Sequence, residues 1–341
     1  MIDIKSYTIA MLEEYLLSIG EAKYRANQIF EWIHKKHVQS FDEMSNISSK
    51  LKLKLKEDCI LVNVEELLYK ESAIDKTRKY LFKLPDGNII ESVFMRYKHG
   101  NSVCISSQVG CRMGCRFCAS TLDGLLRDLS ASEMLDQIYK ISSSTGERVS
   151  NIVLMGAGEP MDNFDNVIKF IEIINSDQGL NISQRNITVS TCGLVPRIKE
   201  LADKKLQITL ALSLHAADDE TRKSLMPIAN KYSIKEVLDA CRYYFDTTKR
   251  RVSYEYGLVA GVNDTKEEAL KLAKLIKNMH AHINLIPINP IEERDYKEPS
   301  HKNVLAFKEI LEKSGIQVTI RREMGRDIDG ACGQLRRSFM A

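Results

Sequence analysis

Residues 110–118 read GCRMGCRFC, and the three cysteines of this stretch, Cys111, Cys115 and Cys118, are spaced as C-x3-C-x2-C. Three thiolates this close together can bind three irons of a four-iron, four-sulfur cluster, which usually takes four cysteine ligands. One iron is then left open for another ligand. The spacing therefore predicts an iron-sulfur site with one open coordination position.

Zinc binding and chance spacing are the alternatives to this interpretation. A structural zinc site closes with four ligands, commonly as two separated pairs, and no second cysteine pair follows here. A disulfide framework is not expected in a long chain that begins MIDIKSYTIAMLEEYLL, because this start lacks the basic and apolar segments of a secretory signal. We therefore favour an iron-sulfur site over zinc or simple packing.

The composition is that of a folded protein without a membrane segment. The chain has 341 residues, of which 44% are hydrophobic and 28% charged, enough for one domain of about 250 residues and a smaller one. The net charge of +3 permits nucleic-acid binding without requiring it. No stretch approaches the roughly 20 apolar residues of a membrane span, and the eight cysteines suggest reduced thiols. We expect a cytoplasmic protein with no membrane partner.

From about residue 102 onward, short β-branched runs alternate with helical patterns, which is typical of β/α units around a parallel sheet. Helices are expected to begin at Ser130 and Thr265, each the first residue of a capping-box pattern, and Gly315 is expected to end the helix that starts near Lys302. Six or seven such units predict a complete or partial barrel with its active site at the carboxyl ends of the strands. The expected strands are 103–107, 151–155, 187–191, 208–212, 252–256, 283–286 and 318–320.

The first hundred residues have a different pattern. Residues 24–34 place apolar side chains on one helical stripe, which predicts a small helical domain with a packed core. Lysine and leucine alternate over 50–56, as in a strand or in a helix with Leu51 and Leu55 on one face. Residues from about 62 to 97, with the turn signal PDGN, suggest a β linker or hairpin.

Polar groups recur where the expected strands end. Residues 156–160 read GAGEP, in which glycines let a ligand approach the backbone and Glu159 can accept hydrogen bonds from an ammonium group. Ser190, Ser213, His215 and Asn289 also lie at or just beyond strand ends. Each could merely satisfy loop backbone, but together they could line a site for a polar ligand.

The cysteine loop, with Phe117 before its last cysteine, resembles the signature of the radical S-adenosylmethionine (SAM) superfamily. The resemblance implies one 4Fe-4S cluster whose open iron is chelated by SAM, and cleavage of SAM to a 5'-deoxyadenosyl radical when the cluster is reduced. It also implies the fold: an α/β protein with a partial (β/α)6 barrel of the TIM type and a small N-terminal helical accessory domain. The GEP run at 158–160 resembles the motif that holds the SAM amino group.

More of the chain resembles one family of that superfamily, the RlmN-type methyltransferases of adenine C2 in 23S rRNA and tRNA. The matching runs are YRANQIFEWI, CISSQVGCRMGCRFCAS, MGAGEPMDN, STCGLVP, SLHA, LMPIANKY, GVNDT, NLIPINP and DIDGACGQL. By position, the family's SAM contacts fall on Gly158, Glu159, Ser190, Ser213, Leu214, His215 and Asn289. Its three cluster ligands fall on Cys111, Cys115 and Cys118.

The resemblance also assigns catalytic roles. Cys332 is the cysteine that one SAM methylates, and a second SAM supplies the radical that activates this methyl group, so two SAM molecules are used per turnover. Adenine C2 is not nucleophilic, and a carbon radical on the Cys332 sulfur can add to it. Cys104 matches the cysteine that resolves the covalent RNA adduct by forming a disulfide. Glu91 matches a carboxylate proposed to contact the adenine, although an exposed strand-end glutamate is the alternative.

The expected partners follow from the same resemblance: 23S rRNA at the peptidyl-transferase centre, tRNA at the adenosine 3' to the anticodon, and an electron donor such as flavodoxin or ferredoxin. The expected organisation is an RNA-binding helical domain (1–61), a β extension (62–96), a radical SAM core (97–327) and a C-terminal tail carrying Cys332 (328–341). Cys59, Cys192 and Cys241 are expected to be packing residues. A C8 methyltransferase and a non-catalytic iron-sulfur protein remain as alternatives.

Overall fold

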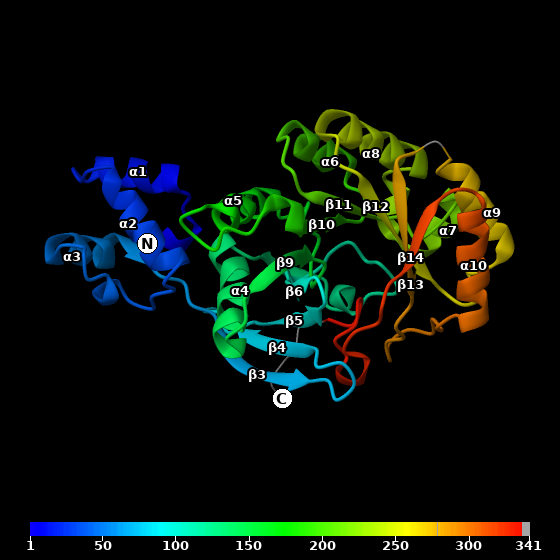
Figure 1. Cartoon of the computed structure of the whole chain (residues 1–341), viewed down its shortest axis with the longest axis horizontal. Coiled ribbons are helices and arrows are strands. Elements are labelled where there is room, and N and C mark those ends of the chain that lie inside the picture. The colour runs from blue at the N-terminus through cyan, green and yellow to red at the C-terminus, as the bar shows by residue number, and fades with distance from the viewer. Residues whose placement is uncertain (278, 336–341) are drawn as a thin grey trace.

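The computed structural model describes residues 1–277 and 279–335. A small group of N-terminal helices lies beside a larger α/β body (Figure 1). The helices of the small group are α1 (Ile9–Ser18), α2 (Tyr24–His34) and α3 (Ser49–Asp58), and the short strands β1 (Ile2–Asp3) and β2 (Cys59–Ile60) pair beside them.

The lysine-leucine alternation over 50–56 forms helix α3, so the helical alternative is confirmed. Ser48 caps the helix by accepting a hydrogen bond from the Leu51 amide, and Leu51 and Leu55 are buried in the core of the small group. On α2, Ile29, Phe30 and Ile33 are buried as expected.

A buried ion pair ties this group to the larger body. Lys5 contacts the Asp136 carboxylate of helix α4 (Ala131–Thr145) at 2.8 Å, and both side chains are only 3% exposed. The second Asp136 oxygen accepts a hydrogen bond from the Val64 amide. Removing either residue would leave an uncompensated buried charge, which is strongly destabilising. The pair therefore holds the N-terminal segment against helix α4.

A ten-stranded sheet forms the centre of the body. Seven strands run parallel in the order β6, β9, β10, β11, β12, β13 and β14, and among the described residues they form an open curve without a closing strand pair. They are β6 (Gly100–Cys104), β9 (Val149–Leu154), β10 (Ile187–Thr191), β11 (Thr209–Ser213), β12 (Val252–Leu258), β13 (Ala281–Pro287) and β14 (Gln317–Ile320). This arrangement confirms the partial α/β barrel.

Residues 62–97 contain the expected β hairpin and extend the main sheet, so the hairpin alternative is the one that the structure has. They contribute three antiparallel strands, β3 (Glu65–Glu71), β4 (Arg78–Lys83) and β5 (Ile89–Tyr97), which continue the same sheet beyond β6. The PDGN turn joins β4 to β5, as the sequence predicts. The first parallel strand also begins and ends three residues earlier than expected, because a tight turn at residues 98 and 99 joins it to β5, and Gly100 already pairs with Tyr97.

Helices cover the outside of the sheet (Figure 1). Ser130 makes the expected capping box at the start of α4, Thr265 caps α9, and Gly315 follows α10 in a left-handed conformation, with φ of +80°. In the described part of the chain, none of the helices is long and apolar enough to cross a membrane. The helices are α4 (Ala131–Thr145), α5 (Phe164–Asn175), α6 (Val195–Asp203), α7 (Asp219–Leu225), α8 (Ile234–Thr248), α9 (Lys266–Leu275) and α10 (His301–Lys313).

Candidate active site

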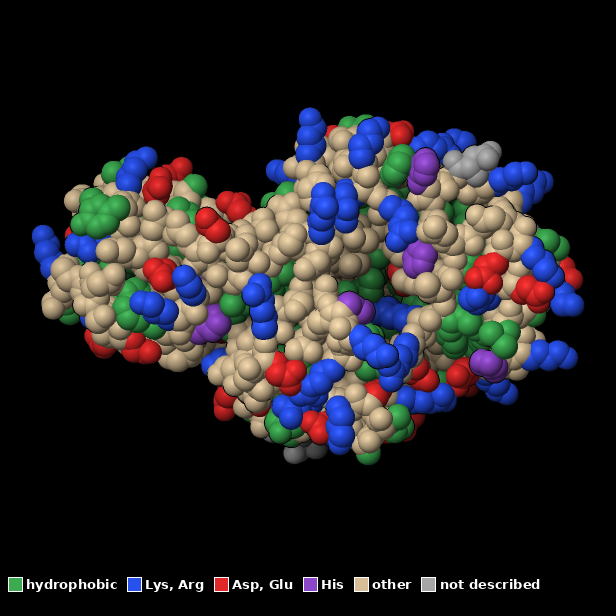
Figure 2. Space-filling model, viewed as in Figure 1, with side chains coloured by type: hydrophobic (Ala, Val, Ile, Leu, Met, Phe, Trp, Pro, Cys, Tyr) green, Lys and Arg blue, Asp and Glu red, His purple; other side chains and the backbone are tan. Residues whose placement is uncertain are grey.

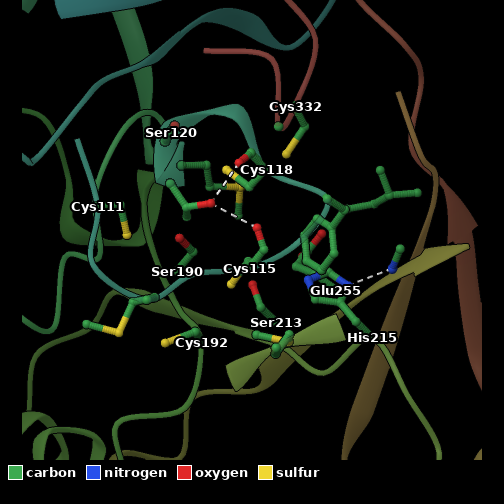
Figure 3. A pocket seen from close by; sticks show the side chains of 18 of the residues that line it. Cys111, Cys115, Cys118, Ser120, Ser190, Cys192, Ser213, His215, Glu255 and Cys332 are labelled. Carbon is green, nitrogen blue, oxygen red and sulfur yellow. Dashed lines mark hydrogen bonds between the residues drawn. The ribbon is translucent and has the colours of Figure 1, made fainter. Parts of the chain in front are cut away.

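A cavity lies at the carboxyl ends of the parallel strands, where barrel active sites collect. Its space, open mouth included, is about 1020 Å³, which suits a cofactor-sized ligand. Figure 3 shows Ser190 among the three cysteines of the loop, Ser213 below them in this view, and Cys332 above them on another segment. Residues as far apart in the sequence as Cys111 and Cys332 thus line the same cavity.

The local structure of the cysteine loop explains how the thiols reach the cavity. The short strands β7 (Gln108–Gly110) and β8 (Leu125–Asp128) pair on either side of the loop. Gly110 has φ of +75°, and a Cβ there would lie 1.9 Å from the Gly124 carbonyl oxygen, so the turn requires glycine. The Arg116 amide donates a hydrogen bond to the Leu225 carbonyl at 2.9 Å, which fixes the loop against helix α7.

The surroundings of the three thiols suit an iron-sulfur cluster, because the positive charge of the irons would stabilise the thiolates. Burial raises the pKa of Cys111 to about 12 and raises the pKa values of Cys115 and Cys118. A charge on Cys118 also raises the pKa values of Cys111 and Cys115. Binding of iron reverses this effect, because a coordinating thiol is deprotonated. Among the described residues no three His, Cys, Asp or Glu side chains converge closely enough for one metal ion, whereas a cluster takes each thiolate on a different iron.

Glu159 is held in a fixed position beside the thiols. Its carboxylate is buried and accepts hydrogen bonds from the Met161 and Cys192 amides at 3.1 and 2.8 Å. Burial raises the pKa of this carboxyl, so a cationic ligand group is needed to stabilise its charge there. The donor set therefore fits an ammonium group at this end of the cavity.

The two glycines of the GAGEP run are required mainly by close packing against neighbouring protein atoms, and less by the approach of a ligand to the backbone. Gly158 has φ of +108°, and a Cβ there would lie 2.7 Å from the Gln108 side chain. A Cβ on Gly156 would lie 2.6 Å from the Ile105 carbonyl oxygen. Both glycines line the cavity, but their small size is required by the chain that leads into the cysteine loop.

The remaining expected SAM contacts divide into two groups. Ser190, Ser213, His215 and Asn289 line the cavity, and the Ser190 hydroxyl donates to the Leu154 carbonyl. Leu214 does not line it: the side chain is fully buried in the core, and its backbone binds Glu255 and Arg222. The role of each residue toward SAM stays a prediction.

His215 has an unusual backbone and a fixed tautomer. Its φ is +57°, and its Nδ1 accepts a hydrogen bond from the Gly257 amide at 2.7 Å. Burial, together with the nearby Arg222 cation, lowers its pKa to about 3. The imidazole is therefore neutral, with its proton on Nε2, and it meets the Phe117 ring edge-on with centroids 4.8 Å apart.

The segment that carries Cys332 closes over the cysteine loop. The Ala119 amide donates to the Gly333 carbonyl at 2.8 Å, and the Ser120 hydroxyl donates to the Leu335 carbonyl at 2.5 Å. Asn289 holds the Cys332 carbonyl from the other side at 3.0 Å. Cys332 itself is exposed and points toward Cys118 (Figure 3).

A second cavity adjoins the first, and Cys332 lines both. Cys104, at the end of β6, lines the second cavity and is buried against Val93 and Met95. Burial raises the pKa of the Cys104 thiol to about 12, and a charge on Cys332 raises it further. Both thiols are free, so the structure brings together the two cysteines that the sequence separates by more than two hundred residues.

Glu91 is not the exposed strand-end residue that the alternative interpretation assumed. It lies within β5 and is 2% exposed, and its carboxylate pairs with Lys79 at 3.5 Å. It shares a strand face with Val93 and Met95, which line the second cavity. Among the residues described, it lines neither cavity itself, so direct contact with a base remains a prediction.

Sequence patterns missed several residues of the cavities, among them four with polar or sulfur-containing side chains. Arg321 and Met155 line both, and Glu255 and Cys192 line the first. Cys59 and Cys241 are buried away from the cavities, as expected for packing residues. Cys192 is also buried, but its place directly after strand β10, which ends at Thr191, could have indicated a cavity position.

Comparisons with known proteins agree with this site. The model of the "Radical SAM superfamily" matches residues 105–275 and that of the "Ribosomal RNA large subunit methyltransferase N-terminal domain" matches residues 2–61. A protein of Lachnospira eligens named "Probable dual-specificity RNA methyltransferase RlmN" is 64% identical, with 100% of this chain and 97% of the relative covered. A protein of the same name from Clostridium novyi is 57% identical, with 100% and 99% covered.

A solved structure has the same architecture over the whole chain. The crystal structure of a radical SAM methyltransferase from Sphaerobacter thermophilus superimposes with a TM-score of 0.93 at 40% identity, covering 98% of this chain and 99% of that one. The similarity thus includes the N-terminal helices, the open barrel and the C-terminal segment. The chain belongs to the RlmN family of radical SAM RNA methyltransferases.

Proposed function

We propose that this RNA methyltransferase adds a methyl group to C2 of an adenosine in 23S rRNA, at the peptidyl-transferase centre, and to C2 of the adenosine 3' to the anticodon in tRNA. The observation that carries the proposal is the position of Cys332. It lines both the cavity with the cluster cysteines and the cavity with Cys104, so one sulfur can meet a methyl donor on one side and a resolving thiol on the other.

We assign the first cavity to the cofactors. Cys111, Cys115 and Cys118 would hold three irons of one 4Fe-4S cluster, and Glu159 would accept hydrogen bonds from the SAM amino group. Ser190, Ser213, His215 and Asn289 would bind the rest of SAM, with His215 donating from Nε2. When bound, the cluster and SAM supply a carbon-centred radical, with one electron from a donor of the flavodoxin or ferredoxin class.

Cys332 would act twice. Its thiol loses a proton and takes a methyl group from a first SAM. The radical from a second SAM then removes a hydrogen atom from that methyl group, and the resulting carbon radical adds to adenine C2. The adduct would lose the C2 proton to a base and one electron, which the oxidised cluster can accept, so that a methylene group joins the Cys332 sulfur to the RNA. The Cys104 thiol then loses a proton and attacks this sulfur. The sulfur-carbon bond breaks with its electron pair on the carbon, which takes up a proton and becomes the new methyl group, and a Cys104–Cys332 disulfide forms.

Lys and Arg side chains surround the hollow in the middle of the face seen in Figure 2. Arg321 and the exposed Arg322 line the second cavity, where they can contact RNA phosphates. The target adenosine must leave its stack to enter, which costs little for a loop or anticodon nucleotide. Cytoplasmic location follows from these substrates.

The related C8 chemistry would use the same cysteines, but Gly158-Glu159-Pro160 fits the C2 family better. Anaerobically reconstituted protein, reduced with dithionite and given SAM and RNA, should release 5'-deoxyadenosine. Protein with a complete cluster that releases none would favour a non-catalytic iron-sulfur protein. The Glu159→Gln variant, whose cysteines are intact, should assemble the cluster and lose SAM affinity.

A further inference from the structure

Arg222, on helix α7, is a fully buried cation one layer behind the first cavity. The side chain is 0% exposed. Its guanidinium donates from Nε to the Leu214 carbonyl at 3.1 Å, and from Nη2 to the Cys192 and Ser213 carbonyls at 2.7 and 3.3 Å. It therefore holds together the ends of β10 and β11, which carry Ser190 and Ser213 into the cavity.

The charge of Arg222 is poorly compensated by the protein. Within the described chain no carboxylate oxygen lies within 4.0 Å of its nitrogens, and its Nη1 is buried without a hydrogen-bond partner. Asp219 is a carboxylate whose charge favours the Arg222 cation, but one of its oxygens accepts a hydrogen bond from the Ile234 amide. A buried guanidinium that binds only carbonyls needs an anion nearby.

Arg222 lies directly behind the cluster side of the cavity, because its guanidinium binds the carbonyls of Cys192 and Ser213, which both line that cavity. Cys115 is a favourable electrostatic partner of Arg222, and as an expected iron ligand it would carry its negative charge once the cluster is bound. Helix α7 also packs directly on the cysteine loop, through the bond from the Arg116 amide to the Leu225 carbonyl. A 4Fe-4S cluster held by three thiolates is negative, and becomes more so on reduction.

Resting on the proposed function, we propose that Arg222 is the buried counter-charge of the cluster and raises its reduction potential. One electron from a flavodoxin- or ferredoxin-type donor reduces the cluster without forming or breaking a bond, and the fixed cation stabilises the extra negative charge. Net charge near a cluster is a known determinant of its potential. Because the carbonyl contacts make Arg222 a structural brace as well, the two roles must be separated experimentally.

The variants Arg222→Gln and Arg222→Lys separate the effect of the charge from that of the carbonyl contacts. Both shorten the side chain and weaken the carbonyl contacts, but only glutamine removes the charge. Redox titrations of the reconstituted cluster, followed by electron paramagnetic resonance, should show that Arg222→Gln lowers the ratio of reduced to oxidised cluster at the wild-type midpoint about tenfold, equivalent to a shift of about 59 mV for one electron. Arg222→Lys should stay close to wild type. Arg222→Met is a second neutral variant, and Arg242→Gln, exposed on α8, is the control.

Equal shifts in the glutamine and lysine variants, or no shift in the neutral variants, would overturn the inference and leave Arg222 as a brace alone. A normal cluster with an unshifted potential in Arg222→Gln contradicts this inference without affecting the proposed function. Absence of any four-iron cluster in reconstituted wild-type protein would instead contradict the proposed function, and this inference with it.

Discussion

The side chain of Asn289 donates a hydrogen bond to the backbone carbonyl of Cys332, with Nδ2 and the oxygen 3.0 Å apart. Asn289 follows strand β13 of the barrel, and Cys332 lies in a segment that crosses the barrel mouth. Both residues line both cavities. The bond therefore restrains where Cys332 lies between the two cavities.

Removing this bond should loosen the C-terminal segment. Asn289→Ala loses one hydrogen bond, typically about 1 kcal/mol, so amide hydrogen exchange over residues 331–335 should become several-fold faster. The Ala119–Gly333 and Ser120–Leu335 bonds remain and keep the segment docked. Unchanged exchange in these amides, measured by mass spectrometry, would show that Asn289 does not restrain Cys332.

The two outlying cysteines should behave differently with RNA. Cys104→Ala should accumulate a covalent RNA-protein adduct, because the adduct forms on Cys332 and cannot be released. Cys332→Ala should bind RNA without cross-linking. Denaturing electrophoresis after anaerobic turnover distinguishes them, and Cys241→Ala, buried outside both cavities, is the control. Equal activity without adduct in both variants would remove both roles.

Gly158 should tolerate no side chain even without cofactors. Its φ of +108° and the 2.7 Å approach of a Cβ to Gln108 combine backbone strain with overpacking, so Gly158→Ala should destabilise the apoprotein by about 2 to 5 kcal/mol. Gly261→Ala is a matched control, because Gly261 has φ of +73° with no atom within 4 Å of a Cβ and should lose about 1 kcal/mol. Equal losses in urea unfolding would mean that the close packing is unimportant.

His215 should make the apoprotein less stable in acid. Its pKa is about 3 in the folded protein, because of burial first and Arg222 second, against about 6.5 when unfolded. The unfolded chain binds the extra proton between these values, so the stabilisation is complete above pH 6.5 and is lost as the pH falls toward 3.

His215→Asn should remove the extra proton that the unfolded chain binds, so the slope of the unfolding free energy against pH should fall by the equivalent of up to about one proton. Asparagine suits this test because it tolerates the left-handed backbone and can accept the Gly257 hydrogen bond. The free energy of unfolding, measured from pH 7 to 4 for both proteins, checks the difference. Parallel curves would show that His215 titrates normally in the folded state.

Much of the fold could be predicted from local patterns, because strands, caps and turns depend on nearby residues. The strand 187–191 and the caps at Ser130 and Thr265 are examples. The start of β6 was wrong by three residues, since its pairing with β5 is a contact between strands that periodicity does not encode. The place of residues 62–97 in the main sheet was missed for the same reason.

The sequence predicted the site residues that lie at the ends of strands. It could not predict contacts between segments that are far apart in the sequence. Ser190, Ser213 and Asn289 lie in the cavity as their strand-end positions suggested. The juxtaposition of Cys332 with Cys118, and the burial of Glu91 beside Lys79, depend on the C-terminal segment and on strand pairing. Arg222 carries no motif, and its importance becomes visible only from its burial and its carbonyl partners.

The central claim is that the chain transfers a methyl group to adenine C2. The most direct test is to digest 23S rRNA and tRNA from cells with and without the gene, and to identify the methylated nucleosides by mass spectrometry against synthetic standards. The account predicts 2-methyladenosine that depends on both the gene and Cys332. Gene-dependent 8-methyladenosine as the sole product, or no methylated adenosine that depends on the gene, would contradict it.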